Sequence, residues 1–419
     1  MSPLRVLIVA YQFPPLGGGG VQRSVKFVKY LPESGWEPTV LTTAARLYHA
    51  EDETLAADLP PGLRVLRAPE LMLGRRVAGR ARRAGVPYAP YLAGWPDREA
   101  GWIPGAVRAG VRAVRELQPH ALYSSAPPAS THMAALAIHR LTGVPWVADF
   151  RDPWANYAFH NGRPPGFAAA DRTAERTVTR HARQVVVSAE FARIEGTEPG
   201  DPKRTFIPNG VDPDDVPDDL PGPDGARFRL AFVGSLYRSI DCAPILAALR
   251  RLAERGVIHP GELEFRVVGN VGVPDLDAGS LDVVRTGYVN HSRAVREMAA
   301  ADALVCYVPS AAPQNTPGKI YEYLATGRPV LCVTAAANYA YRLVDELGAG
   351  ACAEPHEHHR IEAAIEDMFL RWKAGPLAPT GARGPVLARF SRPGLTRRLA
   401  AVLDSAAAAA APLSAAGGR

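Results

Sequence analysis

The chain has 419 residues, of which 47% are hydrophobic and 21% are charged, and its formal net charge is +6. This composition supports at least one large core and excludes a disordered chain or a small scaffold held by disulfides. The excess of positive charge is not concentrated on one element. It therefore argues against a dedicated nucleic-acid binder and favours an anionic ligand or an acidic membrane surface.

The four cysteines, Cys242, Cys306, Cys332 and Cys352, lie in apolar segments of the second half of the chain. They lack the paired short spacing of a zinc site, so we expect reduced core residues and no metal. No stretch reaches the roughly 20 apolar residues that a membrane-spanning helix needs. We predict a cytoplasmic protein, and peripheral attachment at the inner face of the membrane is left open.

Short β-branched runs alternate with turns and helical patterns along the first two hundred residues. The predicted strands cover residues 4–10, 38–43, 121–125, 145–150 and 184–188. A helix is predicted over residues 21–31, where Val21, Val25, Val28 and Leu31 recur on one side. This alternation is typical of a parallel sheet covered by helices.

Residues 212–226 interrupt every periodicity with six aspartates and several prolines and glycines, which predicts an acidic, proline-rich linker. The alternation then resumes, with strands predicted over residues 228–233, 263–268, 283–289, 303–308 and 329–333. We therefore predict an α/β protein with two Rossmann-like, doubly wound domains that face each other across a cleft. They cover residues 1–211 and 227–404, and residues 405–419 are predicted to form a flexible tail.

A run of glycines, residues 17–20, directly follows the first predicted strand. Glycines let the backbone approach a ligand closely, and the helix that follows offers its N–H groups to an anion. The dinucleotide fingerprint is incomplete, because its third glycine would fall on Gln22 or Arg23. We predict a diphosphate or acceptor loop at Gly18 and Gly19, with a plain flexible turn as the alternative.

Asp149, Arg151 and Asp152 lie at the carboxyl end of an apolar predicted strand, close to Trp154. Open α/β sheets bind ligands at that end of their strands. The functional hypothesis places Arg151 and the two carboxylates beside the reacting group. The alternative is an ion pair between Arg151 and Asp149 or Asp152 that closes the strand end, since an unpaired buried charge is costly.

Two segments of the second domain carry candidate phosphate ligands. Gly234, Ser235 and Arg238 follow its first predicted strand, and a guanidinium suits phosphate oxygens, although an exposed loop arginine is an equal alternative. Further on, residues 317–327 predict a short helix with Lys319 and Glu322 on its polar side. Such a lysine can bind a diphosphate and such a glutamate both hydroxyls of a ribose. The alternative is an exposed ion pair.

Two further clusters are charged. Arg75, Arg76, Arg80, Arg82 and Arg83 form a basic patch that suits anionic lipid or a charged acceptor, and a solvated helical face is the alternative. The histidines of residues 356–359 lack the His-Glu-x-x-His spacing, so no metal site is predicted there.

Together and in this order, the motifs resemble nucleotide-sugar-dependent glycosyltransferases of the GT-B fold, family 4, in a branch with a DFRDPW segment. The resemblance covers roughly residues 3–400 and rests on the glycine run, residues 149–154, residues 208–212, residues 234–237 and residues 319–329. It implies transfer of a hexosyl group from a nucleoside diphosphate sugar, the co-substrate, to a hydroxyl of a glycan, lipid-linked or natural-product acceptor. It also implies retention of anomeric configuration, no required cofactor or metal, and no nucleic-acid partner.

By the same resemblance, the N-terminal domain lies on the acceptor side, the C-terminal domain binds the donor, and the last helix crosses back to the N-terminal domain. Gly18, Gly19, Gly234, Ser235, Arg238 and Lys319 would bind the donor diphosphate. Glu322 would bind the ribose, and Gln314, Asn315 and Thr316 would contact the donor sugar. Asp149, Arg151 and Asp152 would be catalytic, and one of the two aspartates would be the base of an inverting reaction.

Three positions depart from the family pattern. Gln314 replaces the first carboxylate of the Glu-x7-Glu pair, Arg151 replaces a histidine, and Ser235 takes the place of a phosphate-binding arginine. Gln314 and Arg151 motivate one alternative, a catalytically silent GT-B subunit that binds a nucleotide sugar or a partner. A nucleotide-sugar epimerase on the same fold is a further alternative.

Overall fold

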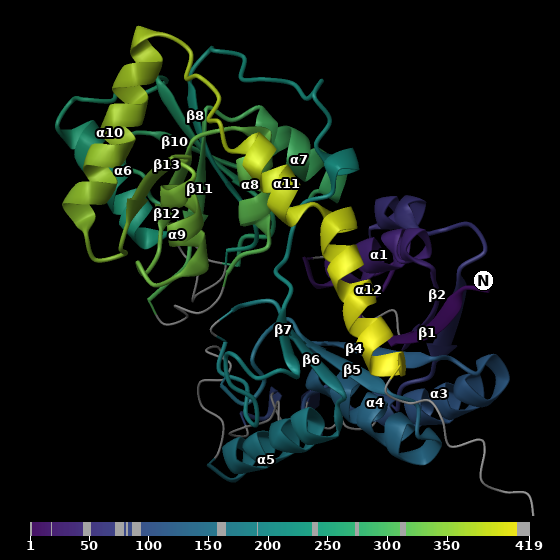
Figure 1. Cartoon of the computed structure of the whole chain (residues 1–419). Coiled ribbons are helices and arrows are strands. Elements are labelled where there is room, and N and C mark those ends of the chain that lie inside the picture. Colours follow the sequence, from purple (N-terminus) through teal and green to yellow (C-terminus); the bar gives the residue numbers. More distant parts are fainter. Residues whose placement is uncertain are drawn as a thin grey trace, which may run out of the picture. The chain divides into compact units, whose positions relative to one another are not determined.

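The computed structural model describes residues 2–17, 19–44, 52–71, 79–80, 83–85, 94–156, 165–190, 192–236, 242–272, 276–310 and 316–408. The chain divides into two compact units (Figure 1). The first comprises Met1–Pro208 together with the chain from Leu395, and the second comprises Asn209–Gly394. Residues 212–226 thus belong to the second unit, where Val216, just after the 3-10 helix η5 (Pro213–Asp215), is part of the core.

In the described part of the first unit, seven parallel strands form one sheet in the order β3-β2-β1-β4-β5-β6-β7. The strands are β1 (Leu4–Val9), β2 (Trp36–Thr43), β3 (Arg64–Ala68), β4 (Ala121–Ala126), β5 (Trp146–Phe150), β6 (Gln184–Val187) and β7 (Arg204–Phe206). The helices are α1 (Gly19–Tyr30), α3 (Ile103–Leu117), α4 (Ala129–Thr142), α5 (Pro165–His181) and α12 (Arg392–Ala408), and the 3-10 helices are η1 (Pro32–Ser34), η2 (Glu53–Asp58) and η4 (Ala100–Trp102).

Helices cover both faces of this sheet, because successive strand residues point to opposite sides. Leu7 and Val9 of β1 belong to a core that includes α3, α4 and α5, whereas Val6 and Ile8 belong to a second core with α1 and α12. β5 is buried along its whole length, as expected of a central parallel strand covered on both faces. The result is a doubly wound domain.

The second unit repeats this arrangement. Six parallel strands of its described residues follow the order β10-β9-β8-β11-β12-β13. The strands are β8 (Phe228–Val233), β9 (Leu263–Val268), β10 (Asp282–Arg285), β11 (Ala303–Tyr307), β12 (Val330–Val333) and β13 (Gly350–Ala353). The helices are α6 (Ala243–Glu254), α7 (His291–Ala299), α8 (Lys319–Thr326), α9 (Tyr339–Glu346), α10 (His358–Ala374) and α11 (Arg383–Phe390). One core lies against α6 and α10, and the other lies against α7, α8, α9 and α11.

The predicted α/β class with two doubly wound sheets is confirmed. β3, β7 and β13 were not predicted from the sequence, and β10 covers Asp282–Arg285 and not the predicted residues 283–289. α12 also continues to Ala408 through a segment predicted as tail, where Ala406 is buried in the core. Alanine is the strongest helix former, so an alanine-rich end can extend a docked helix.

Within the described residues, no helix combines the length and the apolar character needed to cross a membrane. The four cysteines are free thiols, and Cys306, Cys332 and Cys352 lie in register on neighbouring strands.

Candidate functional site

The short helix α8 presents Lys319 and Glu322 from its first turn. Ile320, Tyr323 and Leu324 are buried on its other side, and the Tyr323 hydroxyl donates to the Val233 carbonyl at 3.0 Å and accepts from the Val233 N–H at 2.8 Å. α8 is thereby anchored to the end of β8, directly before Gly234.

Glu322 is held between two cationic side chains. Its Oε2 lies 3.7 Å from Lys319 Nζ, and its Oε1 lies 3.7 Å from His291 Nε2. The side chain is only 12% exposed, and the buried Oε2 accepts no hydrogen bond from the described residues. A buried acceptor without a donor is unfavourable, so a hydroxyl brought by a ligand would satisfy this oxygen.

His291, the first residue of α7, was missed by the sequence analysis. Its Nε2 lies 3.0 Å from Asp215 Oδ2. Burial by itself would lower the pKa of His291, but the carboxylates of Glu322 and Asp215 outweigh burial and Lys319 and raise it. The available signal was the Asn290-His291 pair after β10, where Asn290 caps α7 by accepting the Arg293 N–H at 3.0 Å. The two residues predict the start of a helix, but they do not predict that His291 contacts Glu322 on α8.

Several predicted site residues fall outside the described residues: Gly18, Arg238, Gln314, Asn315, Arg75, Arg76 and Arg82. Of the rest, Gly19 opens α1, Thr316 is partly buried just before α8, and Arg80 and Arg83 are exposed. Gly234 precedes Ser235 in a tightly packed loop, where a Cβ on Gly269 would lie 2.1 Å from the Gly234 carbonyl oxygen. The structure therefore brings Lys319, Glu322 and the chain end of β8 to one part of the second unit.

In the first unit, Asp149 is fully buried at the end of β5 and paired with Arg23 of α1. Arg23 Nε and Nη2 donate to the two carboxylate oxygens at 2.8 and 2.9 Å. Tyr123 and Ser125 donate to the same carboxylate at 2.5 and 3.0 Å. The ion pair expected at this strand end is thus made by Arg23 and not by Arg151.

Arg151 and Asp152 lie beside this pair. The Arg151 guanidinium donates to the carbonyls of Gly20 and Pro127 and, at 3.3 Å, to Gln12 Oε1. Asp152 accepts no hydrogen bond from the described residues and lines a cavity of about 220 Å³ in the first unit. Burial raises the pKa of Asp152, and Arg151 opposes the shift.

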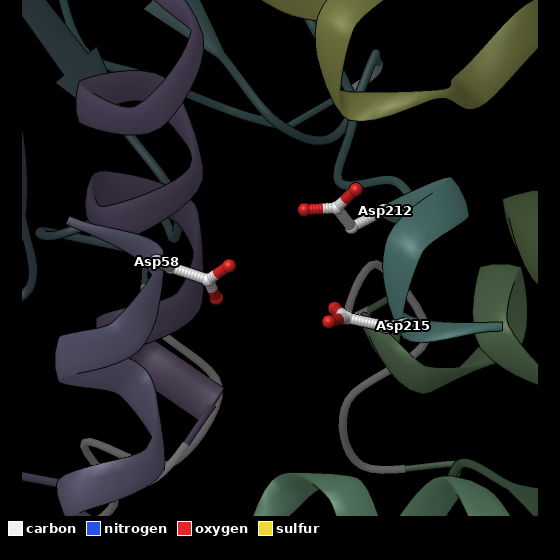
Figure 2. A group of neighbouring side chains, drawn as sticks. All are labelled: Asp58, Asp212 and Asp215. Atoms are coloured by element: carbon white, nitrogen blue, oxygen red, sulfur yellow. The ribbon is translucent and has the colours of Figure 1, made fainter. Parts of the chain in front are cut away.

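Figure 2 shows the side chains of three aspartates, Asp58, Asp212 and Asp215. Asp58 ends η2 in the first unit and pairs with Lys26 at 2.7 Å and Lys29 at 3.0 Å. In the second unit Asp212 directly precedes η5 and Asp215 is its last residue, and Asp215 pairs with His291. We assign no metal to these carboxylates.

Two family models match the chain. Residues 18–210 match a glycosyl transferase 4-like domain, and residues 227–370 match glycosyl transferases group 1. No curated protein matches the chain.

Solved structures share the two-unit fold over nearly the whole chain. A glycosyltransferase from Rickettsia africae ESF-5 has a TM-score of 0.63 at 12% identity, with 97% of this chain and 99% of that chain covered. The α,α-trehalose 6-phosphate synthase of Burkholderia multivorans has a TM-score of 0.60 at 14% identity, with 98% and 100% covered. The catalytic domain of starch synthase IV from Arabidopsis thaliana, bound to ADP and acarbose, has a TM-score of 0.60 at 12% identity, with 97% and 100% covered.

Proposed function

Because this chain is a glycosyltransferase of the GT-B fold, with a glycosyl transferase 4-like domain followed by a glycosyl transferases group 1 domain, we propose that it moves a sugar from a nucleoside diphosphate donor to an acceptor hydroxyl. The enzyme class predicted from the sequence, a hexosyltransferase, is confirmed. We propose transfer in preference to the silent subunit and the epimerase. The donor, the stereochemical course and the site residues are parts of the proposal.

The buried, unsatisfied Oε2 of Glu322 carries the donor assignment. A carboxylate in this position accepts hydrogen bonds from the two hydroxyls of a ribose. Lys319 and the N–H groups that open α8 then face the diphosphate, with Arg238 as a second cation and the backbone of Gly234 and Ser235 alongside. The ADP bound to the starch synthase supports a nucleotide donor here.

The chemistry follows from this distribution of charge. The bond between the anomeric carbon and the diphosphate oxygen breaks, and negative charge grows on the leaving phosphate. Lys319 and the helix N-terminus stabilise that charge, so the proposal requires no metal ion. In a retaining reaction the acceptor oxygen forms the new bond to the anomeric carbon, and its proton passes to the departing phosphate.

The residues of the first unit take different roles in this proposal. Asp149 is fully engaged by Arg23, Tyr123 and Ser125, so we assign it to positioning the end of β5. Asp152 faces the cavity and is the base of choice if the product is inverted. Gly18 and Gly19 bring backbone amides near the transferring group.

We also propose a cytoplasmic location, which four free thiols support, and peripheral membrane contact through residues 75–83, where Arg80 and Arg83 are exposed.

The donor site is tested by the binding of UDP, GDP, TDP and ADP to Lys319→Ala and Glu322→Gln, measured by calorimetry. Loss of a hydrogen bond to a charged group predicts that affinity for the preferred nucleotide falls at least about tenfold in each variant. Arg360→Ala and Glu357→Gln are matched controls, because Glu357, directly before α10, and Arg360 on α10 form an i,i+3 ion pair like that of Lys319 and Glu322. Unchanged binding by the first two variants contradicts the assignment.

A further inference from the structure

The cavity beside Asp152 lies at the carboxyl ends of β4 and β5, where parallel sheets bind ligands. Its volume of about 220 Å³ is smaller than the roughly 300–1,000 Å³ of sites for drug-sized molecules. The described residues around it belong to the first unit and include Gln12, Asp97, Ala129, Asp152 and Trp154. The cavity therefore has room for one small ring.

The charges in the cavity wall disfavour an anionic ligand. Asp97, Glu99 and Asp152 line it, whereas Arg98 is the only cation among the described residues of the lining. Arg98 Nε pairs with Glu99 Oε1 at 2.7 Å. A phosphate or carboxylate entering here would meet like charges, which is costly in a desolvated site.

The N-terminus of α4, which would otherwise attract an anion, is already occupied. Asp97 accepts the Ser130 N–H at 2.9 Å and the Ser130 hydroxyl, so its carboxylate takes the place that a phosphate would fill. Burial and the neighbouring Glu99 raise the pKa of Asp97 to about 6, although the bonds from Ser130 oppose the shift. A negatively charged ligand would add to the repulsion that Asp97 already meets from Glu99.

The aromatic wall of the cavity is fixed by two carboxylates of α5. The indole N–H of Trp154 donates to Asp171 Oδ1 at 3.1 Å, and its backbone N–H donates to Glu175 Oε1 at 2.9 Å. Asp171 Oδ1 also accepts the Trp95 indole N–H at 3.0 Å. Trp154 is therefore held from two directions, as a preformed binding surface requires.

Asp152 and Gln12 supply the polar groups that a hydroxylated ring needs. Asp152 accepts no hydrogen bond from the described residues, although it lies in the cavity wall. Gln12 uses its Oε1 for Arg151, which leaves its amide N–H groups as donors. An aliphatic chain in this cavity would leave the Asp152 carboxylate, whose pKa burial raises, without a hydrogen-bond donor, so it fits poorly.

From these contacts we propose that the cavity is the acceptor subsite and binds an uncharged, sugar-sized ring, one of whose hydroxyls donates to Asp152. The proposal rests on the proposed glycosyl transfer and deepens it, because it names the chemical class of the acceptor. A phosphorylated sugar ring and a lipid chain are excluded from this subsite by the same contacts. Any phosphate carried by the acceptor lies outside the cavity.

The test measures the binding of simple glycosides to the whole chain by saturation-transfer NMR and calorimetry. The probes are the methyl glycosides of glucose, galactose, mannose and N-acetylglucosamine, compared with glucose 6-phosphate and with octyl glucoside. We expect at least one methyl glycoside to bind, glucose 6-phosphate to bind at least about tenfold more weakly than that glycoside, and the octyl chain to add no affinity over methyl glucoside.

Two variants locate the binding. Asp152→Ala removes the carboxylate and is expected to weaken the preferred glycoside at least about tenfold. Ala129→Leu fills the cavity from the first turn of α4 and is expected to abolish binding even if Asp152→Ala folds poorly. Asp367→Asn is the control, because this aspartate is 63% exposed on α10.

The inference is overturned if no methyl glycoside binds, if glucose 6-phosphate binds more tightly, or if both variants retain wild-type affinity. Nucleoside diphosphate binding is measured on the same samples. If the nucleotides bind and the glycosides do not, only this inference fails. If no nucleotide binds, the proposed function fails independently.

Discussion

Arg23 makes four hydrogen bonds although its side chain has no exposed surface. Besides the two bonds to Asp149, Nη1 donates to the Pro208 carbonyl at 2.8 Å and Nη2 to the Ile207 carbonyl at 2.9 Å. Burial alone would raise the pKa of Asp149, but Arg23 and the hydroxyls of Tyr123 and Ser125 lower it. Arg23 thus joins α1 to the end of β5 and to the last residues of the first unit's main segment.

Replacing Arg23 by Met should therefore destabilise the protein strongly. The change leaves the Asp149 carboxylate buried without its cation, which typically costs about 3–5 kcal/mol. Chemical denaturation of the whole chain measures the loss in the free energy of unfolding. Arg112→Gln, which breaks an exposed i,i+4 pair, should change the free energy of unfolding by less than about 1 kcal/mol. Equal losses in the free energy of unfolding would show that the buried pair stabilises the protein no more than the exposed pair does.

His291 gives the stability of the second unit a pH dependence of defined sign. Its pKa is raised above 6.5 by Glu322 and Asp215 despite burial and Lys319. The stabilisation is therefore complete below about pH 6.5 and is lost as the pH rises through the pKa of the folded state. We expect the melting temperature of the wild type to fall relative to that of His291→Gln between about pH 6 and about pH 9. Parallel melting curves across this range would contradict the role of His291.

The sequence predicted individual residues well where the partners lie close together in the chain. A short helix was predicted over residues 317–327, and α8 covers Lys319–Thr326 with Ile320, Tyr323 and Leu324 buried. Asp149 and Arg23, in contrast, are 126 residues apart, and the local pattern offered Arg151 as the nearer cation. His291 was missed for the same reason, because its carboxylate partners belong to η5 and α8.

At the scale of elements, the missed strands share a position. β3, β7 and β13 each lie at an edge of a sheet, and all three are short and only partly buried. An edge strand is covered less than a central one, so its residues lack the continuous apolar run by which β1 and β5 were recognised. α12 differs from these edge strands, because its apolar side is buried and completes the core beside α1.

Leu399→Ala tests the contribution of α12. Leu399 is fully buried with Ile8 and Val25 in the core of the first unit, and truncating such a leucine costs about 2–5 kcal/mol. Chemical denaturation followed by tryptophan fluorescence gives the loss. Arg397→Ala, at an exposed position of the same helix, should stay within about 0.5 kcal/mol. A loss below about 1 kcal/mol for Leu399→Ala would mean that α12 is dispensable to this core.

At the scale of the whole molecule, the two repeats of strand and helix in the sequence predicted two doubly wound domains, and the structure has them. The family resemblance added the donor and acceptor roles that periodicity alone does not carry. The unit boundary lies at Pro208, before the acidic segment. Composition predicted a linker over residues 212–226, because aspartate and proline break periodicity. Asp212 and Val216 are nevertheless buried in the second unit.

A nucleoside diphosphate should stabilise the second unit selectively. Ligand at about 100 times its Kd adds about 2.7 kcal/mol to the state that binds it. Hydrogen exchange followed by mass spectrometry should therefore slow in β8, β11 and α8 and change little in β1 to β7. The Glu322→Gln variant serves as the control for non-specific protection. Equal protection of both sheets, or protection of the first alone, would contradict the placement of the donor.

The first unit is built from two distant parts of the chain, and this has a consequence for its synthesis. A ribosome releases Ile8 and Val25 long before Leu395, Leu399 and Leu403, which lie in the same core. Domains generally fold in the order of their synthesis, but here the apolar side of α1 has to wait until the second unit has been made. The second unit, made of one continuous segment, can complete its folding first, and α12, which is made after it, then completes the core of the first unit.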